Sequence, residues 1–212
     1  MKKFLIFSLL ICSSLTGAPV LAQSAASAPD TLAKSVTDEV IAILRADKDA
    51  YTGNPAKVIE LIETKVLPHF NFVRMTQLAV GKNWRRASAP QREALVEQFR
   101  TLLVRTYATA FTAYRDQTIQ YRPLRMRPED DDVVVRSQIM RHGGPPVAVD
   151  YNMEKAKSGW KVYDVSIEGV SLVQNYRSTF NNEVQRAGID GLISALDNKN
   201  RQLAQKTQGA AP

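Results

Sequence analysis

The chain has 212 residues, a formal net charge of +7 at pH 7 and one cysteine. A single cysteine excludes an intrachain disulfide and a cysteine-rich metal site, and this length suits one α+β domain with a substantial core. The positive charge is consistent with ordinary solubility or with attraction to anionic lipid surfaces and acidic partners.

The N-terminus has the pattern of a secretory signal peptide. Two lysines precede an apolar segment, residues 4–11, that is too short to span a bilayer, and the residues before Gln23 suit cleavage there. We therefore predict a signal peptide over residues 1–22 and an exported chain that meets no nucleic acid. A lipoprotein signal at Cys12 is the alternative, although Ile11 is bulkier than the residue that such a signal requires.

Helices are expected to follow the signal peptide. After a disordered leader over residues 23–29, Asp30 should cap a helix with one apolar stripe. Asn54 before Pro55 is typical of the start of a second helix, which should end at Pro68.

Two more helices should precede the first strand. A short helix is expected over residues 70–80, and the capping box from Ser88 to Gln91 should open the longest helix. Apolar and aromatic residues recur in this long helix at steps of three and four through to about Arg115, which predicts a broad buried stripe. A stripe of this width needs a large apolar partner surface.

An antiparallel sheet is the expected partner. Short connections rich in turn formers separate four predicted strands, over residues 118–126, 133–141, 147–154 and 160–167. Apolar and polar residues alternate along the third strand, so one face of the sheet should be apolar and the other wet.

The chain should end in two helices. Gly169 ends the last strand, and a helix should begin at Ser171 and stop at Gly188. Asp190 should open a final helix, followed by a frayed tail over residues 206–212. The predicted fold class is α+β: a twisted antiparallel sheet of four or slightly more strands, with helices from both ends of the chain on one face. Residues 30–205 should form a single domain.

Few residues suit catalysis or metal binding. His69 and His142 lie in unrelated segments, and the acidic run at residues 129–132 lacks the glycine and glutamate of a calcium loop, which favours a solvated turn. Asp164 and Glu168 could act as a general base beside a tyrosine in an apolar pocket, but Asp164 could equally pair with an arginine or cap the backbone. We therefore expect no bound metal.

Three segments of the chain resemble one known family. The longest and most specific reads YDVSIEGVSLVQNYRSTF, from residue 163, and is followed by GIDGLISAL. The other two are HFNFVRMTQLAVGKNWRRAS, over residues 69–88, and QREALVEQFRTLLVRTYA, over residues 91–108. Together they resemble the MlaC family of periplasmic phospholipid-binding proteins, also known as toluene-tolerance proteins, over residues 32–203. The family often has an aspartate between two phenylalanines where this chain has Asn71.

The resemblance implies a carrier and not an enzyme. It implies a soluble periplasmic monomer without a cofactor, which holds a phospholipid as cargo in an apolar cavity between the sheet and the helices. Its partners would be an outer-membrane lipoprotein–porin complex and an inner-membrane ABC-transporter complex with a membrane-anchored, substrate-binding-type subunit. Such a pathway maintains the lipid asymmetry of the outer membrane.

The cavity implied by the resemblance should lie near the upper end of usual ligand pockets in size. Its wall should come from the long helix, the sheet and the helix after the sheet, although each candidate could instead be ordinary core. The candidates are Phe99, Leu103, Tyr107, Phe111, Val133, Val135, Ile139, Val149, Tyr151, Val162, Val173, Tyr176 and Phe180. Arg177 could face a lipid phosphate at the rim or anchor a carboxylate inside the protein.

Two functions from other classes are the alternatives. The first is an enzyme that uses Asp164 or Glu168 as its base, and the second is a chaperone-like protein that binds apolar segments of exported chains. Within the lipid class, a hopanoid-like or sterol-like cargo is a narrower alternative to phospholipid.

Overall fold

The structure, a computed structural model, describes residues 27–112, 117–141 and 143–209. The predicted signal peptide, the alternative lipoprotein signal at Cys12, most of the leader, His142 and the last three residues of the tail lie outside these ranges. So do residues 113–116, where the sequence predicts the end of the long helix.

The predicted α+β class and the antiparallel meander are confirmed. The strands pair with their neighbours in chain order, all antiparallel, and a short fifth strand extends the expected set. They are β1 (Thr118–Tyr121), β2 (Asp132–Met140), β3 (Val147–Ala156), β4 (Gly159–Ile167) and β5 (Val170–Ser171). The first strand is shorter than predicted. Arg122 still donates its N–H to Arg136 O at 2.9 Å, but Pro123 has no N–H with which to continue the ladder.

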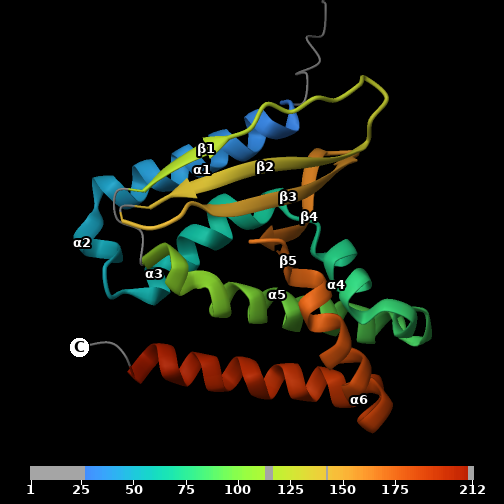
Figure 1. Ribbon diagram of the computed structural model, residues 1–212. Coiled ribbons are helices and arrows are strands. Elements are labelled where there is room, and N and C mark those ends of the chain that lie inside the picture. Colours follow the sequence, from blue (N-terminus) through green and yellow to red (C-terminus); the bar gives the residue numbers. More distant parts are fainter. Residues whose placement is uncertain (1–26, 113–116, 142, 210–212) are drawn as a thin grey trace, which may run out of the picture.

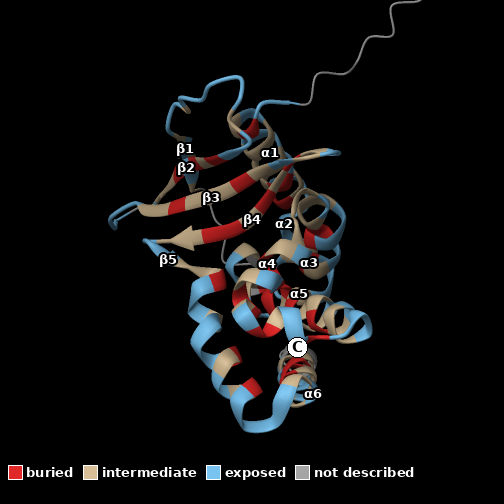
Figure 2. Ribbon diagram, turned by 90° about the vertical axis from the view of Figure 1, so that its right-hand side faces the viewer, coloured by how far each residue is buried: buried red, intermediate tan, exposed pale blue. Residues whose placement is uncertain are grey.

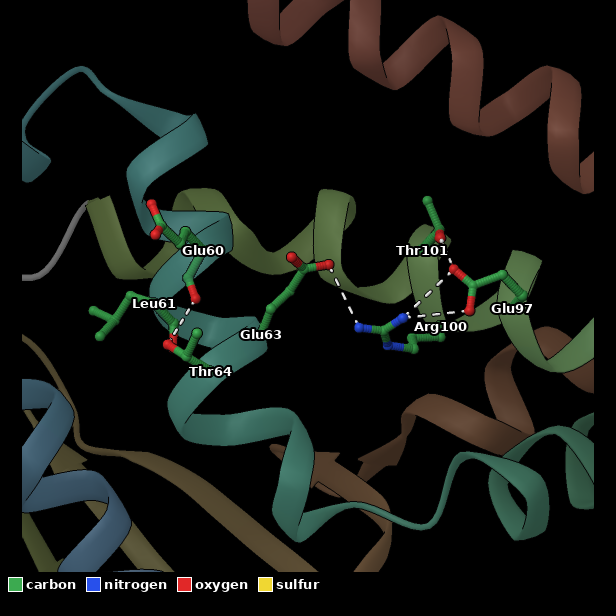
Figure 3. Close-up of polar contacts among 7 residues, drawn as sticks. All are labelled: Glu60, Leu61, Glu63, Thr64, Glu97, Arg100 and Thr101. Atoms are coloured by element: carbon green, nitrogen blue, oxygen red, sulfur yellow. Dashed lines mark hydrogen bonds and ion pairs between the residues drawn. The ribbon is translucent and has the colours of Figure 1, made fainter.

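Eight helical segments precede the sheet within the described part of the chain. They are α1 (Pro29–Ala46), α2 (Lys48–Tyr51), α3 (Pro55–Leu61), the π-helix η1 (Ile62–Val66), the 3₁₀-helices η2 (Leu67–His69) and η3 (Gly81–Arg86), α4 (Phe72–Val80) and α5 (Ala89–Thr112). The second predicted helix thus widens into a π-helix before Pro68. At this transition Thr64 donates to the carbonyl of Glu60, 2.8 Å away (Figure 3).

Side-chain capping explains where several of these helices begin. Asn54 accepts from the N–H of Lys57 at 3.2 Å, as predicted. Ser88 and Gln91 form the predicted reciprocal capping box, with bonds of 3.0 and 3.3 Å. The predicted N-cap of the first helix was wrong by two positions: Pro29 opens the helix, Ala28 is its N-cap, and Asp30 lies in the first turn.

The last helix, α6 (Leu172–Gly209), is two helices joined at Gly188. Gly188 has φ +73°, a left-handed conformation that glycine adopts without strain, and the predicted stop at this residue is confirmed. The second half continues to Gly209, so the prediction of a frayed tail from Lys206 was wrong for its first residues. Among the described residues, no helix is both long enough and apolar enough to span a bilayer.

The elements form layers, with α5 in the middle (Figure 1). The sheet and α1 lie on one side of α5, and the second half of α6 lies on the other. The buried residues face inward between these layers, whereas the outer surface of α6 is exposed (Figure 2). The second half of α6 therefore covers α5, whereas the first half contacts β4 and β5 and places Leu172 on the apolar cluster of the sheet.

A polar network joins the start of α4 to the sheet. Asn71 caps α4 by accepting from the N–H of Arg74 at 3.0 Å, and its own amide donates to Glu154 Oε1 at 2.6 Å. Arg74 bridges Glu154 and Asp132, the second at 2.9 Å, and lies over the ring of Tyr163. The amide nitrogen of Asn71, which an aspartate lacks, therefore has a specific partner in this chain.

Asn71→Asp should lower the free energy of unfolding at neutral pH. The substitution keeps the cap acceptor but places a second carboxylate against Glu154, at an expected cost of about 1–3 kcal/mol. Urea denaturation measures this, with Asn71→Ser as the control that keeps a cap acceptor and adds no charge. Asn71→Asp should be the less stable of the two, and equal stability would show that Arg74 neutralises both carboxylates.

Candidate functional site

An apolar cavity of about 350 Å³ lies between the sheet and the helices. The sheet lines one side, and α1, η1, η2, α4, α5 and the first residue of α6 line the rest. Its lining residues are Leu32, Ala33, Val36, Thr37, Val40, Ile41, Leu44, Ile62, Val66, Leu67, His69, Phe70, Phe72, Met75, Leu103, Val104, Tyr107, Ala110, Phe111, Ile119, Ile139, Val149, Tyr151, Met153, Val162, Val165, Ile167 and Leu172. The volume is near the lower end of the usual range for ligand pockets, about 300–1,000 Å³, and not near the upper end as expected.

Only four residues of this lining have polar side chains, and none is a carboxylate. Thr37 lies 2.7 Å from the hydroxyl of Tyr121. Burial raises the pKa of Tyr107 and of Tyr151, so both phenols stay neutral at physiological pH. The fourth polar residue of the lining, after Thr37, Tyr107 and Tyr151, is His69. A cavity of this composition suits the apolar part of a ligand, because each methylene withdrawn from water contributes about 0.8 kcal/mol.

The structure brings one group of the sequence-predicted residues to this cavity. From α5 come Leu103, Tyr107 and Phe111, and from the sheet come Ile139, Val149, Tyr151 and Val162. The alternation of apolar and polar residues along β3 predicted which face of the sheet is apolar. Val149, Tyr151 and Met153 line the cavity, and the residues between them do not.

The structure does not place the remaining candidates at the cavity. Phe99, Val173, Tyr176 and Phe180 belong to the core between α5 and α6, where the ring of Phe99 lies 5.2 Å from that of Tyr176 and 5.1 Å from that of Phe180. Val133 and Val135 are buried in the cluster that joins the sheet to the start of α1. Val173, Tyr176 and Phe180 are core because the first half of α6 packs them against α4 and α5, and only its first residue, Leu172, reaches the cavity.

Arg177 also lies away from the cavity. Its exposed side chain packs over Gly81, where an added Cβ would come within 3.3 Å of Nε. Gly81 has φ +61° at the end of α4, a backbone conformation that glycine adopts without strain. A side chain at this position would also crowd the guanidinium group of Arg177. Arg177 is neither at the cavity lining nor inside the protein.

Sequence reasoning missed three parts of the lining. The first is α1, which contributes Leu32, Ala33, Val36, Thr37, Val40, Ile41 and Leu44; the second is η1 and η2; the third is the start of α4 with Phe70 and Phe72. The signal was present in α1, because these positions recur at steps of three and four. Nothing in the sequence distinguishes a stripe that faces a cavity from one that faces a core.

The carboxylates that could have served as a base are occupied or exposed. Asp164 is buried and caps α6: it accepts from the hydroxyl of Ser171 at 2.5 Å and from the N–H of Val173 at 3.1 Å. Glu168 is exposed in the turn between β4 and β5, with φ +51°. Of the roles weighed for Asp164, backbone capping is the one that the structure supports. Within the described residues, no three histidine, cysteine or carboxylate side chains group as a metal site.

Comparison with known proteins agrees with this architecture. A model of the MlaC protein family matches residues 34–198. The chain belongs to the MlaC family. A solved structure of a phospholipid-binding protein from Ralstonia solanacearum, in complex with a phospholipid, is 40% identical and superposes with a TM-score of 0.78. This similarity covers 84% of the chain and 99% of the Ralstonia chain.

Two curated proteins are similar to this chain over nearly its whole length. The intermembrane phospholipid transport system binding protein MlaC of Haemophilus influenzae is 25% identical over 198 residues, which is 92% of this chain and 91% of the relative. The toluene tolerance protein ttg2D of Pseudomonas putida is 25% identical over 189 residues, 88% of this chain and 86% of the relative.

Removing the carboxylate of Asp164 should destabilise the fold. Asp164→Ala leaves the N–H of Val173 without its acceptor, and we expect a loss of about 1–3 kcal/mol in the free energy of unfolding. Asp164→Asn keeps one acceptor oxygen and should lose less. Thermal and urea denaturation of both variants measure this, and an unchanged stability in Asp164→Ala would show that the cap contributes nothing.

His69 should make stability depend on pH. Burial, and then the nearby Lys161, lower its pKa from 6.5, while Glu39 opposes this shift. The folded state therefore favours the neutral imidazole, so protonation below about pH 6.5 favours the unfolded chain. The free energy of unfolding should fall as the pH decreases from 6.5 through the lower pKa of the folded state.

The comparison with His69→Gln isolates this contribution. Urea denaturation of both proteins between about pH 7.5 and pH 5 should show a smaller loss in the variant, since all other titrating groups are common to both. Parallel pH profiles for the two proteins would contradict a lowered pKa for His69.

Proposed function

We propose that this protein is a soluble periplasmic carrier that moves phospholipid between the outer and inner membranes. The observation that carries the proposal is the apolar cavity between sheet and helices, in a chain 40% identical to a protein whose structure holds a phospholipid. The name of the Haemophilus relative, an intermembrane phospholipid transport binding protein, supports the same activity.

A cavity of this kind is sufficient for the task. The two acyl chains of a phospholipid contain about thirty methylenes, whose exposure to water costs on the order of 20 kcal/mol. Transfer from a bilayer to a protein interior of similar polarity avoids most of that cost. The carrier then needs no bond-breaking step, no metal and no cofactor, and in this proposal the phospholipid itself is the cargo.

The proposed wall for the acyl chains combines the predicted and the newly found residues. Leu103, Tyr107, Phe111, Val149 and Tyr151 form it on the side of α5 and the sheet, and the apolar stripe of α1 forms it on the opposite side. We place no cationic residue on the phosphate, so one carrier would accept several head groups.

The proposed partners are those that the resemblance to the MlaC family implies. A carrier released by signal-peptide cleavage before Gln23 would exchange lipid with an outer-membrane lipoprotein–porin complex and an inner-membrane ABC-transporter complex. The chain would act as a monomer between them and thereby help to maintain the lipid asymmetry of the outer membrane.

Native mass spectrometry tests the cargo. The chain from residue 23 to residue 212, purified from the periplasm without detergent, should have an added mass equal to one diacyl phospholipid, and extraction should identify it. A hopanoid mass would change the cargo, a peptide mass would favour a chaperone, and the bare protein mass would count against a carrier.

Filling the cavity should remove the lipid without unfolding the protein. Val36 lines the cavity from α1, and Val36→Trp introduces a large ring where the acyl chains would lie. Val73→Trp is the matched control, because Val73 is 55% exposed on α4 and is not part of the lining. We expect at least a several-fold loss of bound lipid in Val36→Trp alone, at a melting temperature close to that of the control. Equal lipid content in both would show that this cavity does not hold the cargo.

A further inference from the structure

Helix α1 runs along one side of the cavity and packs on the sheet near its start and on α3 near its end. Near its start, Leu32 and Ala33 pack against the apolar cluster of the sheet. Near its end, Val40 and Leu44 pack with Leu61 of α3. Between these attachments α1 lines the cavity with Val36, Thr37 and Ile41.

The two attachments differ in strength. At the end of α1, Val40 and Leu44 are buried, at 4% and 7% exposure, and the chain continues directly into α2. At the start of α1, Pro29 is buried, but Leu32 and Ala33 are only half-buried. Between Pro29 and Val40 the helix therefore depends on polar contacts as well as on apolar packing.

Tyr121 of β1 supplies these polar contacts. Its hydroxyl oxygen lies 2.7 Å from Thr37 Oγ1 and 3.1 Å from the carbonyl oxygen of Ala33. A phenol has one proton, and only donation to the carbonyl satisfies both contacts, with the hydroxyl of Thr37 donating to Tyr121. Burial raises the pKa of Tyr121, so the phenol remains a donor throughout the physiological range.

The opposite side of the cavity is fastened more firmly. On η1, Glu63 lies 3.5 Å from Arg100 of α5, which also bonds to Glu97 (Figure 3). At the start of α4, the N–H of Asn71 donates to Val162 O at 2.8 Å, and Phe70 forms a bridge with Val162. That side is thus tied by backbone hydrogen bonding to β4, whereas the polar contacts between α1 and the sheet come from tyrosine hydroxyls: Tyr121 bonds to Thr37 and Ala33, and Tyr151 of β3 also bonds to Thr37.

We propose that Tyr121 is the latch of the cavity: its hydroxyl holds the start of α1 on the sheet, and its release lets α1 swing out on its buried end to admit and release lipid. This inference rests on the proposed carrier function. Opening in this way breaks both contacts of the hydroxyl and moves Val36 and Thr37 away from the sheet. The hinge lies at Val40 and Leu44, which remain packed.

The test is the rate at which a fluorescent phosphatidylcholine leaves the loaded protein for excess phosphatidylcholine vesicles. Tyr121→Phe removes the hydroxyl and keeps the ring, so we expect exit about 2- to 10-fold faster, the range for one hydrogen bond. Tyr163→Phe is the matched control. It also loses a tyrosine hydroxyl bond, 2.8 Å to Asp132, but neither Tyr163 nor Asp132 is part of the cavity lining.

Thr37 provides a second approach to the same latch, in case the phenylalanine variant folds poorly. Thr37→Val should accelerate exit, Thr37→Ser should not, and Tyr121→Phe combined with Thr37→Val should be no faster than the more rapid single variant. Hydrogen exchange should show faster opening of residues 30–37 in Tyr121→Phe, with residues 40–44 unchanged.

The outcomes separate the latch from the carrier function. If every variant binds lipid and the exit rate is the same in Tyr121→Phe and Tyr163→Phe, the latch proposal is wrong and the proposed carrier function stands. No lipid bound to the wild-type protein overturns the carrier, and the latch with it. Faster exit in Tyr163→Phe as well would show a general loosening of the sheet and would also overturn the latch.

Discussion

The architecture depends on α5 having two apolar faces. One face, with Leu95, Phe99 and Leu102, packs on α4 and α6 in a closed core. The other, with Phe111, faces the cavity, and Leu103 and Tyr107 lie between the two faces, in the core and at the cavity lining at once. Because α6 completes the hydrophobic core on the far side of α5, the sheet side need not be filled. A helix with a single apolar stripe would have to pack directly on the sheet, and no cavity would remain.

The sequence predicts the elements better than it predicts the cavity. Capping residues such as Asn54, Ser88 and Gly188 act on their immediate neighbours, so their patterns identify helix ends directly. The alternation along β3 likewise identifies the correct face. The shortened β1 follows from Pro123, a local signal that was available. In contrast, Phe99 and Leu103 are apolar residues of one helix and members of one core, and their spacing does not show that only Leu103 also lines the cavity.

The missed contribution of α1 has the same origin. An apolar stripe must be covered, but periodicity does not say whether side chains or a ligand cover it. Similarly, Asp164 was a candidate base until the structure showed its contacts with Ser171 and Val173. Both cases concern contacts between segments far apart in the chain or across a turn, which composition and spacing do not encode.

A lipid carrier also faces a kinetic constraint that the fold must satisfy. A cavity sealed by a large apolar interface would hold its cargo well but would open only at a cost of many kcal/mol. A cavity without a cover would expose the acyl chains to water, at about 0.8 kcal/mol for each methylene. Helix α1, held at its end by apolar packing and near its start by Pro29 and by tyrosine hydroxyls, lies between these limits. Water can replace the neutral contacts of Tyr121 with Thr37 and Ala33, so in the proposed opening their loss costs little net free energy. The same contact orders α1 over the cavity when it is closed.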